Sequence, residues 1–172
     1  MLTAQAAPPL TPGQVEGLVQ NLELLCGRRP VRLCYLYGSY ARGTPTALSD
    51  LDVGFLLDLP DRKARWKLWG DLYHEVSFFC PDHEVDLVVL NDVGPILRNK
   101  IIRDGRLVYQ KDARTRVDFE CQTLKAYFDF KPYADVYDRA LFDCIKGGEF
   151  GGRCRDRSHA VEQAEGFGAP SG

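Results

Sequence analysis

The sequence predicts a mixed α/β (α+β) fold in which helices pack on a small mixed sheet and a pair of helices follows at the C-terminal end. Apolar runs of strand length alternate with stretches of helical periodicity. The hydrophobic fraction of 45% suits a globular core, and 172 residues suffice for one core but not for two ordinary domains. We expect a flexible N-terminal segment (1–10), one folded domain (11–146, with its C-terminal helices from about 112) and a disordered tail (147–172).

Composition and charge narrow the class of protein. The 22 Lys and Arg residues nearly balance the 24 Asp and Glu residues, so we expect no direct nucleic-acid binding. The six cysteines form no CxxC pair, which indicates reduced thiols rather than a disulfide framework or a zinc site. The N-terminus lacks the pattern of a secretory signal, and no apolar run approaches the roughly 20 residues that span a bilayer. We therefore expect a cytoplasmic protein without a membrane partner.

The first helix has a clear start signal. Thr11 is placed to cap it, Pro12 suits the first helical position, and Gln14 completes a capping box. Apolar residues then recur at helical spacing until the helix ends near Gly27, which predicts that one face packs on the sheet. These apolar residues are Val15, Leu18, Val19, Leu22 and Leu25.

The stretch 31–57 contains the residues that point to chemistry. It predicts a strand, a polar loop that begins with Gly38-Ser39, and a second strand that opens with Asp50-Leu51-Asp52. Because alternate residues of a strand face the same side, Asp50 and Asp52 would share one face. Two neighbouring carboxylates repel each other, and a divalent cation such as Mg²⁺ relieves that repulsion. Gly38 would allow the backbone to approach a ligand closely, and N–H groups of a following helical turn would suit phosphate.

Further elements follow in order. A helix after Asp61 is expected to bury an aromatic stripe, and Cys80-Pro81-Asp82 ends it. Residues 84–90 read as a strand that carries Asp86, and Asn91-Asp92 is expected to cap a helix that ends at Gly105. A short edge strand is expected at 106–110. The stripe expected in the core consists of Trp66, Trp69, Leu72, Val76 and Phe79.

The segment from Asp112 to about Lys146 predicts two amphipathic helices. The expected break is at Lys131-Pro132, because proline disfavours helical geometry in the residue before it. Both helices carry apolar residues that need a surface to cover, either their own sheet or a second protein.

The motif at 38–52 resembles a known family. The pattern Gly38-Ser39, ten residues, Asp50, one residue, Asp52 resembles the signature of nucleotidyltransferases with a DNA polymerase β-like palm. Its flanks, Ala-Arg-Gly at 41–43 and Ser-Asp-Leu-Asp at 49–52, are similar to those of the minimal nucleotidyltransferase branch. The resemblance covers about residues 13–145 and implies the nucleotidyltransferase fold.

The resemblance also implies roles for particular residues. Asp50, Asp52 and a third carboxylate on a neighbouring strand, which Asp86 matches, would be the catalytic residues and would ligate two Mg²⁺ ions. Asp86 would also accept the proton of the attacking hydroxyl. The nucleotide-binding residues would be Gly38 and Ser39, at the β- and γ-phosphates of ATP, and Arg42.

The resemblance implies a partner as well. Minimal nucleotidyltransferases of this kind are antitoxins that form hetero-oligomers with HEPN ribonuclease toxins and silence them by transferring AMP from ATP to a tyrosine. The chain has no room for a separate substrate domain, and its C-terminal helices carry Tyr127, Phe130 and Tyr133, which suit a protein interface. Two alternatives remain: a small-molecule nucleotidyltransferase of the aminoglycoside type, and an antitoxin that binds without catalysis.

Overall fold

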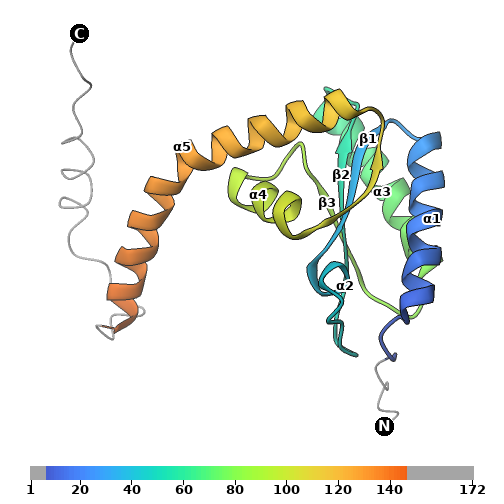
Figure 1. The fold of residues 1–172 in the computed structure, drawn as a ribbon. Coiled ribbons are helices and arrows are strands. Elements are labelled where there is room, and N and C mark those ends of the chain that lie inside the picture. The colour runs from blue at the N-terminus through green and yellow to red at the C-terminus, as the bar shows by residue number, and fades with distance from the viewer. Residues whose placement is uncertain (1–6, 147–172) are drawn as a thin grey trace. The chain divides into compact units, whose positions relative to one another are not determined.

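The computed structural model describes residues 7–146, without the side chains of residues 137, 140, 143 and 144. A four-stranded sheet in the order β3–β2–β1–β4 carries helices on both faces (Figure 1), which confirms the mixed α/β class. The elements are α1 (Pro12–Arg28), β1 (Val31–Tyr37), α2 (Gly38–Arg42), β2 (Leu51–Leu57), α3 (Arg62–Phe79), β3 (Val85–Val89), α4 (Pro95–Asp104), β4 (Arg106–Gln110) and α5 (Ala113–Lys146). Two compact units divide the chain, Met1–Phe130 and Lys131–Gly172, and we describe each by itself.

The sheet is mixed, as predicted. Strand β1 pairs antiparallel with both β2 and β4, whereas β2 and β3 are parallel. The central strands β1 and β2 are buried along almost their whole length, which is typical of strands covered on both faces. Strand β4 lies at an edge of the sheet, as the sequence indicated.

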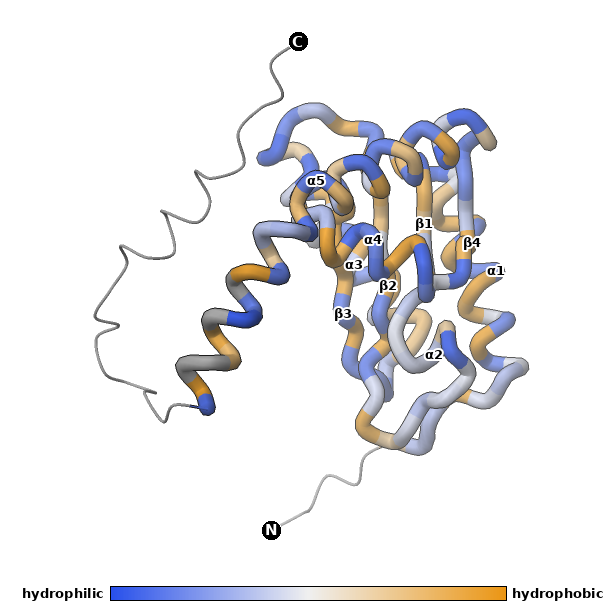
Figure 2. The backbone as a smooth tube through the Cα atoms, turned by 60° about the vertical axis from the view of Figure 1, so that its left-hand side comes forward, coloured by the Kyte–Doolittle hydropathy of each residue, from blue (hydrophilic) through white to orange (hydrophobic). Residues whose placement is uncertain are grey.

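Apolar side chains form a core on each face of the sheet. One core joins α1 and α3 to the sheet through Leu22, Val53 and Leu72. The other joins α4 and the first part of α5 to the sheet through Leu56, Ile101 and Phe119. Figure 2 shows long apolar stretches along the central strands, whereas apolar and polar residues alternate along α1. The alternation places one apolar side of α1 on the sheet and leaves the other in solvent.

Helix α1 begins as its sequence predicts. The Thr11 side chain accepts a hydrogen bond from the backbone N–H of Gln14, and the Gln14 side chain accepts one from the backbone N–H of Thr11. The predicted apolar face is confirmed: Leu18, Leu22 and Leu25 are buried with their neighbours.

Helix α3 differs from the expected pattern at its N-terminal end. Leu72 and Val76 are buried, but the Trp66 side chain is 71% exposed, so its placement in the core was wrong. Its ring stacks on Trp69, which donates a hydrogen bond from Nε1 to the carbonyl of Leu87 (2.8 Å). The first turns of α3 line a cavity together with residues of β3, so Trp66 is not enclosed by the core.

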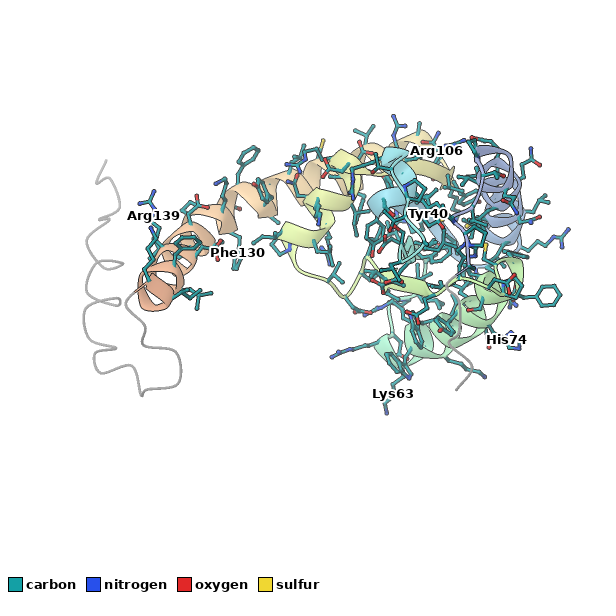
Figure 3. The ribbon with its side chains drawn as sticks, turned by 90° about the horizontal axis from the view of Figure 1, so that it is seen from below. Tyr40, Lys63, His74, Arg106, Phe130 and Arg139 are labelled. Atoms are coloured by element: carbon teal, nitrogen blue, oxygen red, sulfur yellow. The ribbon has the colours of Figure 1, made fainter. Side chains whose placement is uncertain are left out.

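The polar face of α3 is turned to solvent. Figure 3 shows Lys63 and His74 projecting away from the packed side chains of the unit. Both residues lie on the side of the helix opposite the buried Leu72.

The start of α4 also differs from the prediction. Gly94, and not Asn91-Asp92, is the residue that precedes the first helical turn, and it provides no side-chain cap. Asn91 instead bonds the backbone of Leu57 twice: Oδ1 accepts from its N–H (2.8 Å) and Nδ2 donates to its carbonyl (3.1 Å). The expected end of the helix at Gly105 is confirmed.

The predicted C-terminal pair of helices is wrong, because α5 is a single helix with Pro132 inside it. A proline within a helix removes one backbone hydrogen bond, and the remaining bonds can carry the helix past it. The helix crosses the division between the two compact units, which falls at Phe130, two residues before the proline. The tail predicted at 147–172 lies outside the described residues.

The N-terminal segment is described only from residue 7. Leu10 packs against the core and donates its backbone N–H to the hydroxyl of Tyr40 (3.3 Å). The Pro8 carbonyl lies 3.2 Å from the ring nitrogen Nε2 of His83. Residues 7–10 are therefore in contact with the folded unit, and the flexibility expected for 1–6 concerns residues outside the description.

Candidate active site

The site begins where β1 ends and the chain turns into the short helix α2. Gly38 makes this turn with φ of 70°, a left-handed conformation that favours glycine. A Cβ atom at this position would lie 1.8 Å from Oδ2 of Asp52, far inside van der Waals contact. Glycine is thus required both by its backbone conformation and by the carboxylate beside it.

Helix α2 is fixed to the body of the unit by Tyr40. This side chain is buried, lies among packed side chains in Figure 3, and accepts the hydrogen bond from the N–H of Leu10. Ser39 is half-buried, and its hydroxyl has no hydrogen-bond partner within residues 7–146, whereas its carbonyl accepts from the N–H of Thr44 (3.0 Å). The hydroxyl predicted to bind phosphate is therefore available to a ligand.

Strand register aligns three polar side chains across the sheet. Tyr37 of β1 pairs with Asp52 of β2, and Asp52 pairs with Asp86 of β3. Directly paired residues point to the same face, so all three lie side by side on one face of the sheet. The prediction that Asp86 lies on a strand next to Asp52 is confirmed.

Asp50 lies just before the strand that it was predicted to open. Strand β2 begins at Leu51, so Asp50 precedes the strand and is exposed, although it still acts electrostatically on Asp52. Asp52 is half-buried and Asp86 is exposed. The carboxylates therefore form a cluster with one member partly sheltered and two facing solvent.

The cluster changes the proton affinity of its central member. Burial raises the pKa of the Asp52 carboxyl above its ordinary value, and the negative charges of Asp86 and Asp50 raise it further. The positive charges of Arg42 and Lys100 act in the opposite direction. A cation bound among the carboxylates would remove the repulsion that favours the protonated form.

Two cations thus lie within electrostatic reach of Asp52, and the sequence pointed to only one of them. Arg42 is the last residue of α2 and belongs to the motif. Lys100 lies on α4, next to Ile101. Ile101 packs against the sheet: its Cγ2 atom would lie 3.7 Å from a Cβ atom placed on Gly54. No spacing in the sequence links Lys100 to the motif, because the packing of α4 over the sheet brings them together.

Tyr37 is the second residue of the site that sequence reasoning missed. Its only signal was its position directly before Gly38, within an apolar strand. Burial, followed by the charges of Asp86 and Asp52, raises the pKa of its hydroxyl. The hydroxyl therefore stays protonated at neutral pH and faces the carboxylates as a hydrogen-bond donor.

The family of the chain follows from a comparison with known families. The model of the family described as "Polymerase beta, Nucleotidyltransferase" matches residues 20–114, which is more than half of the chain. The chain belongs to this family. The match contains the motif with Gly38, Asp50 and Asp52, and also the strand with Asp86, so all of these residues lie within the nucleotidyltransferase domain.

A curated relative of the nucleotidyltransferase is the protein adenylyltransferase MntA of Shewanella oneidensis. It is 34% identical over 80 residues, which are 46% of this chain and 54% of that protein. The chain thus spans about half the length of the curated relative it matches.

Solved structures match over more of the chain. A chain of the crystal structure of a toxin–antitoxin with AMP-PNP is 25% identical, with a TM-score of 0.51, and the match covers 80% of this chain and 99% of that chain. A structure of the tri-AMPylated Shewanella oneidensis HEPN toxin in complex with MNT antitoxin is 24% identical, with a TM-score of 0.51, covering 77% and 98%. At 24% identity, the second likeness shows the fold alone.

The carboxylates fit a magnesium ion in part. Within residues 7–146, no group of three or more His, Cys, Asp or Glu side chains is arranged to hold a metal. Mg²⁺ needs only one or two carboxylates, however, and takes its remaining ligands from water and phosphate oxygens. Asp52 and Asp86, side by side and oxygen-only, meet that smaller requirement.

A cavity lies away from the carboxylates. It has a volume of about 800 Å³ and lies between α3 and β3, with Trp66, Trp69 and Val88 in its lining. None of the residues predicted for the site line it.

No helix in the described part of the chain is both long and apolar enough to cross a membrane.

Proposed function

We propose that this nucleotidyltransferase is an antitoxin that transfers AMP from ATP to a tyrosine hydroxyl of a HEPN-family toxin. The observation that carries the proposal is the row of Asp52 and Asp86 beside Gly38, in a chain that belongs to the nucleotidyltransferase family. The relative named a protein adenylyltransferase supports AMP as the transferred group and a protein as the acceptor. The likeness to a toxin–antitoxin structure with AMP-PNP supports the toxin partner and the nucleotide.

The reaction forms one bond and breaks another at the same phosphorus atom. The acceptor oxygen bonds to the α-phosphorus, the bond from that phosphorus to the bridging oxygen breaks, and pyrophosphate leaves. Such a transfer depends on positioning and on neutralising charge rather than on a covalent bond to the protein. Asp86, exposed at the edge strand, accepts the proton of the acceptor hydroxyl.

Other residues hold the nucleotide. The backbone of Gly38 and the hydroxyl of Ser39 bind the β- and γ-phosphates, and Arg42 and Lys100 balance the negative charge of the triphosphate. Asp52 and Asp86, together with Asp50, would hold Mg²⁺. Bound Mg²⁺ would neutralise the charge of the phosphates and the charge that develops on the attacking and leaving oxygens.

Each compact unit carries exposed aromatic residues that belong to α5. Within the first compact unit, Phe128 and Phe130 are exposed. Within the second, Tyr133 is 69% exposed and Phe142 is 60% exposed. Exposed aromatic side chains are enriched at protein interfaces, so we assign these residues to the contact with the toxin in a cytoplasmic hetero-oligomer.

Co-expression with a HEPN-family toxin tests the proposal. We expect the intact mass of the toxin to increase by one or more AMP groups, and Asp52→Asn to abolish the increase. Asp71→Asn is the matched control, because Asp71 is an exposed aspartate on α3 that contributes nothing to the site.

Two results would contradict the proposal in different ways. A toxin that is neutralised but unmodified, equally by the chain with Asp52 and by Asp52→Asn, would show an antitoxin that acts by binding alone. A toxin that is neither bound nor modified, together with AMP transfer to a small molecule such as an aminoglycoside, would show an enzyme with a different acceptor.

A further inference from the structure

Tyr37 is placed at the point where the nucleotide would meet the carboxylates. It is the last residue of β1, directly before Gly38, and its pairing with Asp52 fixes its direction on the sheet. Its ring packs in the core on that face, whose other members include Leu56, Leu90 and Ile101. The packing holds the ring in place and leaves the hydroxyl near the row of carboxylates.

The Tyr37 hydroxyl has no hydrogen-bond partner within residues 7–146, although the side chain is only 8% exposed. Two other buried tyrosines nearby do have partners. The hydroxyl of Tyr35 donates to Oε1 of Glu120 (3.0 Å), and that of Tyr40 accepts from the N–H of Leu10 (3.3 Å). Among the described residues, the buried side-chain atoms without a partner are Arg116 Nε and Thr123 Oγ1, so the Tyr37 oxygen keeps access to the surface of the site and is open to a ligand.

A ligand here must accept a hydrogen bond. A tyrosine phenol is protonated at neutral pH, so it can donate a hydrogen bond but does not act as a base. A triphosphate is rich in acceptor oxygens, and Gly38, its expected contact, is the very next residue. A hydrogen bond to a charged acceptor is stronger than one between neutral groups.

We propose that the Tyr37 hydroxyl binds the nucleotide substrate directly, donating a hydrogen bond to an oxygen of the triphosphate held beside Asp52 and Asp86. This inference rests on the proposed function, because it takes a nucleoside triphosphate as the substrate. It adds a residue that the motif does not contain. Phenylalanine would fill the same apolar core, so the hydroxyl itself is what the proposal concerns.

The test compares Tyr37→Phe with Tyr35→Phe, which is a matched control on the same strand and the same face of the sheet. Calorimetric titration with AMP-PNP and Mg²⁺ gives nucleotide affinity, and thermal unfolding without ligand gives stability. We expect Tyr37→Phe to weaken AMP-PNP binding by about tenfold and to leave the melting temperature unchanged. We expect Tyr35→Phe to lower the melting temperature, since it breaks the bond to Glu120, and to keep the affinity.

The opposite pattern would overturn the inference. If Tyr37→Phe binds AMP-PNP as tightly as the unsubstituted chain does, the hydroxyl has no role in binding. If the unsubstituted chain itself binds no AMP-PNP, the proposed function fails and this inference fails with it. Loss of affinity in both variants to the same degree would indicate a general effect on the fold of β1 and would also overturn it.

Discussion

At the scale of single residues, the position of one carboxylate depends on the absence of one side chain. Gly38 combines a positive φ with close approach to the Asp52 carboxylate. Gly43 at the end of α2 has nearly the same φ, 72°, but a Cβ there would meet nothing within 4 Å. Substitutions at these two glycines can therefore be compared: both cost free energy through backbone strain, but only the one at Gly38 also displaces Asp52.

We predict that Gly43→Ala lowers the free energy of unfolding by about 1–2 kcal/mol from backbone strain alone, and that Gly38→Ala lowers it by more, because its Cβ must also displace the Asp52 side chain. Only Gly38→Ala should lose AMP transfer, because the added Cβ pushes Asp52 out of the row. Urea unfolding and a transfer assay on both variants check this. Transfer at the normal rate in Gly38→Ala would show that the close packing of Gly38 and Asp52 is unimportant.

At the scale of elements, polar side chains join segments that are distant in sequence. Arg29 at the end of α1 forms an ion pair with Glu75 of α3, and both are partly exposed, so this pair adds little stability. Asn91 contributes more, because it satisfies the N–H and carbonyl of Leu57 at the end of β2, where Leu57 is only 2% exposed. The loop after β3 is thus attached to the end of β2.

We predict that Asn91→Ala lowers the free energy of unfolding by about 1–3 kcal/mol, since it leaves two backbone groups of Leu57 without partners. Gln20→Ala is the control, because Gln20 is an exposed amide on α1 and its truncation should change stability by less than about 0.5 kcal/mol. Chemical denaturation of both variants measures the difference. Equal stabilities would mean that water replaces Asn91 at Leu57 without cost.

At the scale of the whole molecule, the ionised Asp52 carboxylate lowers the stability of the fold when no ligand is bound. The raised pKa of Asp52 means that the folded state holds a proton at this carboxyl more tightly than the unfolded chain does. The stabilising contribution of the protonated form is complete below the ordinary pKa of 3.8 and is lost as the pH rises through the raised value. At neutral pH the ionised Asp52 therefore opposes folding.

We predict that Asp52→Asn is more stable than the unsubstituted chain at neutral pH without divalent ions, that this advantage shrinks as the pH falls through the raised pKa of Asp52, and that it is gone below 3.8. Thermal unfolding in a chelator across this pH range is the measurement, with Asp71→Asn as the reference for removing an exposed charge. A stability difference for Asp52→Asn that does not change with pH would show that Asp52 titrates normally in the folded state.

The sequence by itself determined the features that depend on neighbouring residues. The capping box at Thr11, the succession of strand, turn and strand in the motif, and the turn at Gly38 follow from local backbone chemistry, and the spacing of Asp50 and Asp52 is itself a sequence pattern. Apolar periodicity placed the face of α1 correctly for the same reason. It failed at Trp66, which is exposed beside a cavity between α3 and β3, because periodicity does not show which turns of a helix are enclosed by the core.

Only the tertiary structure decided which residues lie next to the motif. The row of Tyr37, Asp52 and Asp86 depends on strand order and register, and the approach of Lys100 depends on how α4 packs over the sheet. Tertiary contacts also took Asn91 from its expected helix cap to the backbone of Leu57, because a buried strand end gains more from these hydrogen bonds than an exposed helix start does. The lateral neighbours of a site are set by long-range packing, which local sequence patterns do not encode.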